Sequence, residues 1–414
     1  MPTGAARRCR QAGIDVLTVH GGHGYLIHQF LSPVTNHRDD EFSNPTFFLR
    51  LVLDAVRDQA GPEQAVGLRI SAHEGHPAGL SADAAFALME EVPLDRLDFL
   101  DISAGSYEAG EWIVQPGEWE PEVLAPYARR YRQYLGLPVG VAGRINSARA
   151  AARIVASGQA DFVSLARTLH ADPAFPGRVL SGDAYRPCIA CNRCIDELHD
   201  NQPIGCSVNA RAGREEVANT PHRAARARIL VAGGGPAGME TARLPAEDGH
   251  TVRLLEAGSR LGGAFRLAAG LRQHPDYRLL LDWLEGELDR LGVVVHTERP
   301  VDEEVLASRD DAIVVATGAV GRDAAGLLPA GADLRDTEER RVRIGTAGAE
   351  EWIDAPGPLL VSQGAVPDTG FSTHACAAGP GWGYIRWGRR TKRASLKRCF
   401  ASAEQAARTL RSRL

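Results

Sequence analysis

The sequence predicts an α/β protein built in two parts: an incomplete (β/α)8 barrel of the TIM type, followed by a doubly wound domain. Two observations predict this arrangement. Short apolar runs alternate with helix-like stretches from Ile14 to about Leu169, and a second strand–helix pattern runs from Arg228 to about Gly318. Repeated strand–helix units give parallel strands that are joined by helical crossovers.

Five strands are expected in the first part, because five short runs are mostly apolar and several contain β-branched residues. They are Ile14–Val19, Val66–Ser71, Phe99–Ser103, Pro138–Ala142 and Phe162–Leu165. Helices are expected between them near Thr46–Gln59, Ala82–Glu91, Glu122–Tyr134 and Ser147–Ser157. A closed barrel needs eight strands, and a doubly wound open sheet also fits five by count. The motifs described below favour a barrel without its first three units.

The composition is that of a soluble globular protein, with 44% hydrophobic and 24% charged residues among 414. The net charge of −5 argues against nucleic acid or an anionic membrane as a partner. No apolar run could span a bilayer, and no apolar stretch precedes Gly13, so neither a membrane anchor nor a secretory signal is expected. The odd number of 7 cysteines suits a reducing compartment, which predicts a cytoplasmic location.

Four cysteines have the spacing C-x2-C-x2-C-x11-C: Cys188, Cys191, Cys194 and Cys206. Three closely spaced thiolates can hold three corners of a cubane, and a later cysteine can supply the fourth ligand. The pattern therefore predicts a [4Fe–4S] cluster. The alternatives are disulfides or a structural zinc site, although zinc prefers two C-x2-C pairs that are separated by a longer loop.

A glycine-rich loop opens the second part. The strand expected at Arg228–Ala232 runs into GGGPAG, then into a helix, and then into a strand that ends in Glu256. In this G-x-G-x-x-G pattern, Gly233 makes the turn, Gly235 lets the backbone approach a pyrophosphate, and Gly238 lets helix and strand pack. Glu256 would accept hydrogen bonds from a ribose hydroxyl. A Rossmann-like domain that binds an adenine dinucleotide is predicted, and an ordinary βα turn is the alternative.

The first strand ends in two histidines and a tyrosine, in the sequence HGGHGY from His20 to Tyr25. Catalytic residues of barrels lie at the carboxyl ends of the strands. His20 and His23 could hold a substrate oxygen or carboxylate, and Tyr25 could donate a proton. The alternatives are loop histidines that only make structural hydrogen bonds, or a pair of metal ligands.

Three arginines lie in or just after three further strands. Arg69 lies in the expected barrel wall, where a buried arginine needs an electron-rich partner: the edge of a flavin, or a salt bridge with Asp101 or Glu74. Arg144 and Arg167 end the last two strands, after which the phosphate site of a barrel is usually found. Two arginines at this position fit a phosphate monoester.

The segment HGGHGYLIHQFLSP resembles the H-G-A-H-G-Y-L-x-x-Q-F-L-S-P signature of the old yellow enzyme family. The order of barrel, four-cysteine segment and GGGPAG unit resembles the 2,4-dienoyl-CoA reductase and trimethylamine dehydrogenase branch, which contains NADH:flavin oxidoreductases with an iron–sulfur cluster. The resemblance covers about Ala5 to Gly318 and, weakly, Ser395–Leu410. Four segments are expected: 1–185 (partial barrel, FMN and substrate), 186–220 (iron–sulfur segment and linker), 221–320 (FAD or dinucleotide) and 321–414 (divergent, with a closing helix).

The resemblance implies a role for each motif. FMN would lie across the barrel mouth with Arg69 at its pyrimidine edge, and His20, His23 and Tyr25 would hold and protonate the substrate. The FMN phosphate would be bound by Gly143, Arg144, Ala166 and Arg167. The adenine dinucleotide, FAD in the reductases, would be held by Gly233, Gly235, Gly238 and Glu256. NAD(P)H would be the electron donor, and the cluster would pass single electrons between the flavins.

The implied chemistry is reduction of an activated C=C bond in an enone or enoyl thioester, or oxidative demethylation of a small amine. The sequence departs from the family: three βα units are missing before the first motif, Ala166 replaces a glycine, and no second glycine-rich loop follows Gly318. Two alternatives therefore stay open, an inactive truncated fragment that binds only a cluster or dinucleotide, and a zinc-stabilised binding module. An open barrel exposes two sheet edges, which would favour a homo-oligomer.

Overall fold

The computed structural model describes residues 2–215, 226–272, 274–300 and 310–316, five short strands beyond them, and Glu404. The chain divides into two compact units, Met1–Ala166 and Arg167–Leu414. This boundary differs from the end of the partial barrel expected at residue 185. The segment that follows Arg167 shares a hydrophobic core with the rest of the second unit.

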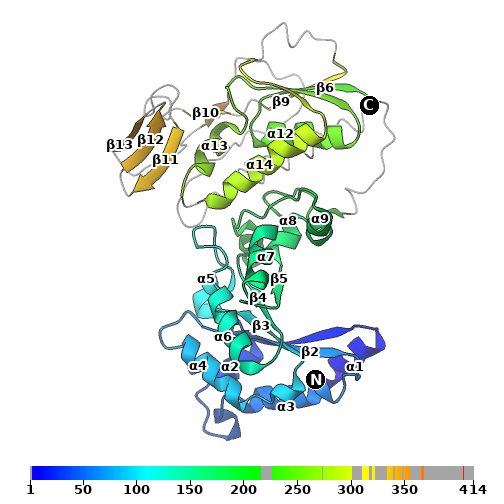
Figure 1. The fold of residues 1–414 in the computed structure, drawn as a ribbon, viewed down its shortest axis with the longest axis vertical. Coiled ribbons are helices and arrows are strands. Elements are labelled where there is room, and N and C mark those ends of the chain that lie inside the picture. The colour runs from blue at the N-terminus through cyan, green and yellow to red at the C-terminus, as the bar shows by residue number, and fades with distance from the viewer. Residues whose placement is uncertain are drawn as a thin grey trace. The chain divides into compact units, whose positions relative to one another are not determined.

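The first unit contains a sheet of five parallel strands (Figure 1). They are β1 Val16–Gly21, β2 Ala65–Ser71, β3 Phe99–Ser103, β4 Val139–Ala142 and β5 Phe162–Ser164. Each strand pairs with the next one in the chain, in the order β1-β2-β3-β4-β5. A doubly wound sheet reverses direction at a switch point, whereas a barrel adds its strands consecutively. The strand order therefore favours the barrel-type interpretation over the open doubly wound sheet.

Four helices of the first unit lie where the sequence predicts them: α3 Phe47–Arg57, α4 Ala82–Ala87, α6 Ala125–Leu135 and α7 Ala148–Ala156. The unit also contains α1 Pro2–Gln11, α2 Leu26–Leu31 and α5 Gly110–Ile113, and short 3-10 turns at Glu41–Ser43, Leu88–Glu91, Leu94–Arg96 and Tyr107–Ala109. Ser147 caps α7, since its Oγ accepts a hydrogen bond from the Ala150 backbone N–H at 3.2 Å.

The two faces of the five-stranded sheet differ in chemistry. Residues such as Leu68, Ile70 and Leu100 belong to the hydrophobic core that also contains Leu49 and Leu53 of α3. Successive side chains of a strand point to opposite faces. The residues that alternate with them in β2 and β3 are polar near the carboxyl ends of the strands. They are Arg69, Ser71, Asp101 and Ser103. The helices thus cover an apolar face, and the other face carries polar groups where the strands end.

The second unit contains a sheet of four parallel strands, β6 Arg228–Ala232, β7 Thr251–Leu255, β8 Val294–His296 and β9 Ala312–Val315. Their order is β8-β7-β6-β9. The strands β7 and β8 are therefore added on one side of β6, and β9 pairs with its other side. This is the order of a doubly wound sheet, with a switch point between β6 and β9. The helices of this part are α12 Pro236–Glu247, α13 Gly263–Ala269 and α14 Pro275–Arg290.

The cysteine segment belongs to the second unit. It contains α8 Arg167–Ala171, α9 Phe175–Ser181 and α10 Arg193–His199. Ala171, Ile189 and Val208 are buried in the same hydrophobic core as Ile229 of β6 and Leu281 of α14. The segment is therefore part of the packing of this unit.

Short antiparallel strands lie beyond the four-stranded sheet. A three-stranded sheet consists of β11 Asp333–Glu338, β12 Arg341–Thr346 and β13 Ala349–Asp354, and β10 Ala319–Gly321 pairs with β14 Ala365–Pro367. The alternation in RVRIGT of β12 is a strand signal that the sequence interpretation did not use. The closing helix expected at Ser395–Leu410 falls outside the described residues, apart from Glu404. Among the described residues, no helix combines the length and apolar character that a membrane crossing requires.

Candidate active site and cofactor-binding regions

Three aromatic side chains gather at the carboxyl end of β1. The ring centroids of His20 and His23 are 4.9 Å apart, and those of His20 and Tyr25 are 5.1 Å apart. The structure thus brings together all three residues that the sequence pointed to. Tyr25 is 51% exposed, and the centroid of its ring lies 5.6 Å from that of Tyr107.

Serines at the ends of β2 and β3 hold His23. Its backbone N–H donates to Ser71 Oγ at 3.0 Å, and its Nε2 shares a 2.7 Å hydrogen bond with Ser103 Oγ. Ser71 Oγ in turn donates to the Gly105 carbonyl oxygen at 2.8 Å. His23 has a φ of 63°, a left-handed conformation that these bonds help to maintain. The loop is therefore fixed by three neighbouring strand ends.

Both histidines of the loop are held in the neutral form. Burial, followed by the charges of His20, Arg69 and His28, lowers the pKa of His23 to about 3. Burial and the charge of Arg69 also lower the pKa of His20. A neutral imidazole can donate one hydrogen bond without carrying charge. Nδ1 of His20 is buried without a hydrogen-bond partner among the described residues, which leaves it available to a ligand.

Arg69 and Asp101 lie in one row with His20 across the first three strands. His20 is in register with Arg69, and Arg69 with Asp101. Arg69 donates from Nε to Asp101 Oδ2 at 2.9 Å, and its Nη2 lies 2.7 Å from the same oxygen. Asp101 is thus the salt-bridge partner, and Glu74 is not. Burial raises the pKa of Asp101 despite the neighbouring arginine.

The sequence interpretation missed a buried pair behind the histidine loop. His28 on α2 accepts a hydrogen bond at Nδ1 from the Gly24 backbone N–H at 2.7 Å, and its Nε2 lies 3.3 Å from Glu74 Oε1. Both side chains are only 1% exposed. Ser71 and Ser103 were missed as well. The signal was available, because both strands end in Ile-Ser, and strand ends are where polar barrel residues gather.

The residues predicted to bind the FMN phosphate have partners of their own. Arg144 is buried and donates from Nε to the Trp119 carbonyl at 2.5 Å and from Nη2 to the Gly117 carbonyl at 2.9 Å. Arg167 donates to Asn192 Oδ1 at 2.5 Å. Gly143 has a φ of 111°, and a Cβ there would lie 2.9 Å from Leu124. The described contacts assign no phosphate to Gly143, Arg144, Ala166 or Arg167, so this role stays a prediction.

The glycine-rich loop has the geometry that its sequence predicts. It connects β6 to α12, which has Pro236 at its start. A Cβ on Gly238 would lie 1.8 Å from the Gly233 carbonyl oxygen, so only glycine allows this close packing. A Cβ on Gly235 would meet nothing within 4 Å. Glu256 follows β7, and its carboxylate accepts from the backbone N–H groups of Gly234 and Gly258, both at 2.7 Å.

The four cysteines lie close enough together to influence one another's pKa. Burial raises the pKa of Cys188 and of Cys206 to about 12, and the charge of Cys191 adds to both shifts. Burial and the charge of Cys191 also raise the pKa of Cys194. In the described part of the chain, no three acidic, histidine or cysteine side chains lie close enough to bind a single metal ion. The mutual influence on their pKa values indicates that the four thiols share one neighbourhood.

A sheet of consecutive parallel strands, with polar residues gathered at their carboxyl ends, is typical of β/α-barrel enzymes. Residues 3–185 match the model of the NADH:flavin oxidoreductase / NADH oxidase family, so this part of the chain belongs to that family. This confirms the resemblance to the old yellow enzyme group.

Two curated relatives and a solved structure extend the similarity beyond the family match. The chain is 34% identical over 325 residues to an NADH oxidase of Thermoanaerobacter brockii, covering 76% of this chain and 50% of the relative. It is 33% identical to an N,N-dimethylglycine/sarcosine dehydrogenase of Chromohalobacter salexigens, covering 76% and 47%. A 2-naphthoyl-CoA reductase complex superposes with a TM-score of 0.72 at 27% identity, covering 77% and 50%. The chain spans about half the length of the relatives it matches.

Proposed function

We propose that this protein is a flavin-dependent oxidoreductase in which electrons pass between FMN, a [4Fe–4S] cluster and FAD or NAD(P)H. Its substrate would be a small molecule, either an activated alkene or a methylated amine. The observation that carries the proposal is the convergence of His20, His23 and Tyr25 at one strand end, beside Arg69. The family match supports a flavin as the redox group.

The residues around the histidine loop fit a flavin and a polar substrate group. Nδ1 of His20 and Oδ1 of Asp101 are buried without hydrogen-bond partners among the described residues. Such atoms are costly unless a bound group satisfies them. Arg69 is 29% exposed and uses one oxygen of Asp101, so it has further N–H donors for a flavin edge. FMN, when bound, would supply hydride transfer.

The protein's own groups would handle the substrate and the proton. His20 and His23, neutral and partly buried, would donate hydrogen bonds to a carbonyl or carboxylate oxygen of the substrate. Tyr25 would deliver the proton in alkene reduction, since the residue is half exposed and its ring packs against His20. In amine oxidation the same pocket would orient the substrate nitrogen, and Tyr25 would position the methyl group.

In the second unit, the glycine-rich loop and Glu256 would hold an adenine dinucleotide. The start of α12 faces the loop, and a helix N-terminus favours phosphate. The open space at Gly235 fits close approach of a pyrophosphate. Each oxygen of Glu256 accepts one backbone N–H, so each has a further lone pair for a ribose hydroxyl.

The donor set of the cysteine segment favours a cluster over zinc. The cysteines are grouped as three closely spaced residues and a fourth that follows after eleven residues. Structural zinc sites typically use two C-x2-C pairs separated by a longer loop. The iron of a cubane requires soft thiolate ligands, and four cysteines are its usual set. The spacing therefore favours a cluster over a zinc-stabilised module.

The proposal is tested by purifying the full chain without oxygen and extracting its cofactors. We expect FMN and FAD by chromatography, and four iron and four sulfide per chain, on the order expected for one cubane. Anaerobic addition of NADH or NADPH should bleach the flavin absorption. Colour without bleaching by NAD(P)H or any substrate would favour an inactive binding protein, and zinc without sulfide would favour the zinc module.

Two kinds of substrate, one for each arm of the experiment, distinguish the two proposed reactions. Cinnamate and an enoyl thioester test alkene reduction, and N,N-dimethylglycine tests demethylation. Reoxidation of the reduced flavin by the alkenes supports the first reaction. Flavin reduction by the amine, with formaldehyde as a product, supports the second. Failure of both arms in a protein that contains FMN would exclude both substrate classes.

A further inference from the structure

A buried ionic network connects the cysteine segment to the doubly wound domain. Arg186 precedes Cys188 by two residues, and its Nη2 donates to Glu240 Oε1 on α12 at 3.3 Å. Glu240 also accepts from Arg243 Nε at 2.8 Å and Nη2 at 3.0 Å. The side chains of Glu240 and Arg243 are 3% exposed, and that of Arg186 is 11% exposed.

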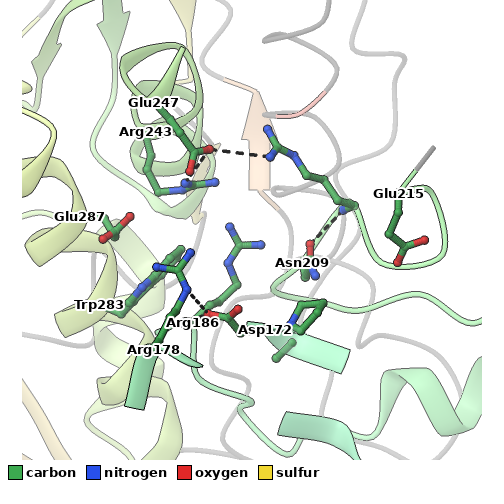
Figure 2. Close-up of a pocket in the computed structure, with 12 residues that line it drawn as sticks. Asp172, Arg178, Arg186, Asn209, Glu215, Arg243, Glu247, Trp283 and Glu287 are labelled. Carbon is green, nitrogen blue, oxygen red and sulfur yellow. Dashed lines mark hydrogen bonds and ion pairs between the residues drawn. The ribbon is translucent and has the colours of Figure 1, made fainter. Parts of the chain in front are cut away.

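Trp283 of α14 completes the network. The guanidinium carbon of Arg186 lies 4.7 Å from the centroid of the Trp283 ring, and that of Arg243 lies 5.4 Å from it. Both distances are within the range of cation–π attraction. Figure 2 shows these side chains around a pocket of about 200 Å³. One residue of the cysteine segment is thus held by two helices of the neighbouring domain.

The network leaves Arg186 as a cation with few partners. Glu240 forms two hydrogen bonds to Arg243 but a single, long one to Arg186. Nε of Arg186 is buried and has no hydrogen-bond partner among the described residues. Asp172 accepts from the backbone N–H of Arg186 at 2.9 Å, which fixes the main chain there. A cation in this position keeps most of its electrostatic effect on its surroundings, because burial reduces screening.

We propose that Arg186 is a positioning residue of the iron–sulfur site: it fastens the segment that carries Cys188 to α12 and α14, and its charge favours the reduced cluster. The inference rests on the proposed function, because it requires the cluster. The reduction potential of a cluster depends on nearby charge, hydrogen bonding and exposure. A fixed positive charge stabilises the added electron, and the carboxylate of Glu240 opposes it.

The test uses the full, cluster-loaded chain and three variants, Arg186→Met, Arg186→Lys and Glu240→Gln. Arg278→Met is the matched control, because Arg278 forms a pair with Asp282 in which both side chains are more than half exposed. Dithionite titration with redox mediators, followed by electron paramagnetic resonance, gives the cluster potential. Iron and sulfide content and the melting temperature are measured on each variant.

The expected shifts have opposite signs. Arg186→Met should make the potential more negative than that of the wild type, and Glu240→Gln should make it more positive. Arg186→Lys should keep the potential near the wild-type value while losing part of the iron, because lysine cannot reproduce the contacts with Trp283 and Glu240. Arg278→Met should match the wild type in both. Structural damage alone would move the potentials of the first two variants in the same direction.

Three outcomes would overturn the inference. The first is a shift of the Arg186→Met and Glu240→Gln potentials in the same direction, and the second is an Arg186→Met variant with the same potential and iron content as Arg278→Met. The third applies if Glu240→Gln does not fold, and is an equal potential for Arg186→Met and Arg186→Lys. A wild-type protein that binds no iron would instead remove the proposed cluster itself, so the two failures are distinguishable.

Discussion

The histidine loop of the first unit and the cysteine segment of the second are both irregular, yet they are held in different ways. Strand-end neighbours hold the loop, through the bonds of His23 to Ser71 and Ser103. A hydrophobic core and a buried ion pair hold the cysteine segment, and Arg186 and Glu240 are 54 residues apart in sequence. The geometry of the histidine loop is therefore set by the neighbouring strands of its sheet, whereas the position of the cysteine segment depends on side-chain contacts between residues far apart in the sequence.

The largest effect is expected at the hydroxyl of Tyr25. Tyr25→Phe should lower alkene reduction by ~10²–10⁴-fold, the usual contribution of a positioned general acid. Stability should not change, because the side chain is 51% exposed. Stopped-flow reoxidation of the reduced flavin measures the effect. Tyr134→Phe is the control, since Tyr134 is 72% exposed and its ring contacts Phe86. Equal losses in both variants would show that Tyr25 is not the specific donor.

Two glycine substitutions separate folding from binding in the second unit. Gly238→Ala should destabilise this unit by about 3 kcal/mol, because the new methyl group would lie 1.8 Å from the Gly233 carbonyl oxygen. Gly235→Ala should leave stability unchanged and weaken dinucleotide binding, because its methyl group would occupy open space at the loop. Urea unfolding and FAD content measure the two effects. Normal FAD content in Gly235→Ala would argue against a pyrophosphate at this loop.

The neutral histidines predict a pH dependence of the first unit. The pKa of His23 is lowered to about 3 in the folded state, from the usual histidine value of about 6.5. Between these values the unfolded state binds more protons, so stability is complete above about pH 6.5 and is lost as the pH falls toward 3. The loss from His23 should reach ~2 kcal/mol at pH 5. Melting temperatures across this range should show a smaller slope for His23→Asn; an unchanged slope would contradict the lowered pKa.

The smallest effect is expected from the serine that holds His23. Ser103→Ala removes the 2.7 Å hydrogen bond and should cost ~1 kcal/mol in stability, with a rise in KM as the imidazole loses its orientation. Ser157→Ala is the matched control, because the Ser157 hydroxyl bonds to local groups, the Ile154 carbonyl of the preceding helix and the Gln159 side chain. A rise in KM in the control as large as that in Ser103→Ala would contradict the orienting role.

Much of the site could be predicted because it depends on local patterns. The strand expected at Phe99–Ser103 has the bounds of β3, and the G-x-G-x-x-G spacing identified the turn between β6 and α12. The salt bridge between Arg69 and Asp101 was one of two alternatives, and only the register of β2 and β3 selects it over Glu74. The pair of His28 and Glu74 could not be predicted, because its partners lie on elements that the sequence does not place side by side.

Local sequence patterns are enough to predict the parallel strands, the histidine and glycine-rich motifs and the family, because periodicity, turn chemistry and short motifs act over a few residues. Tertiary structure alone decided that the cysteine segment packs on the doubly wound domain and that Arg186 meets Glu240 and Trp283. It also decided that both loop histidines are neutral. Burial and ion pairing depend on which distant groups share one space, and a linear pattern does not contain that information.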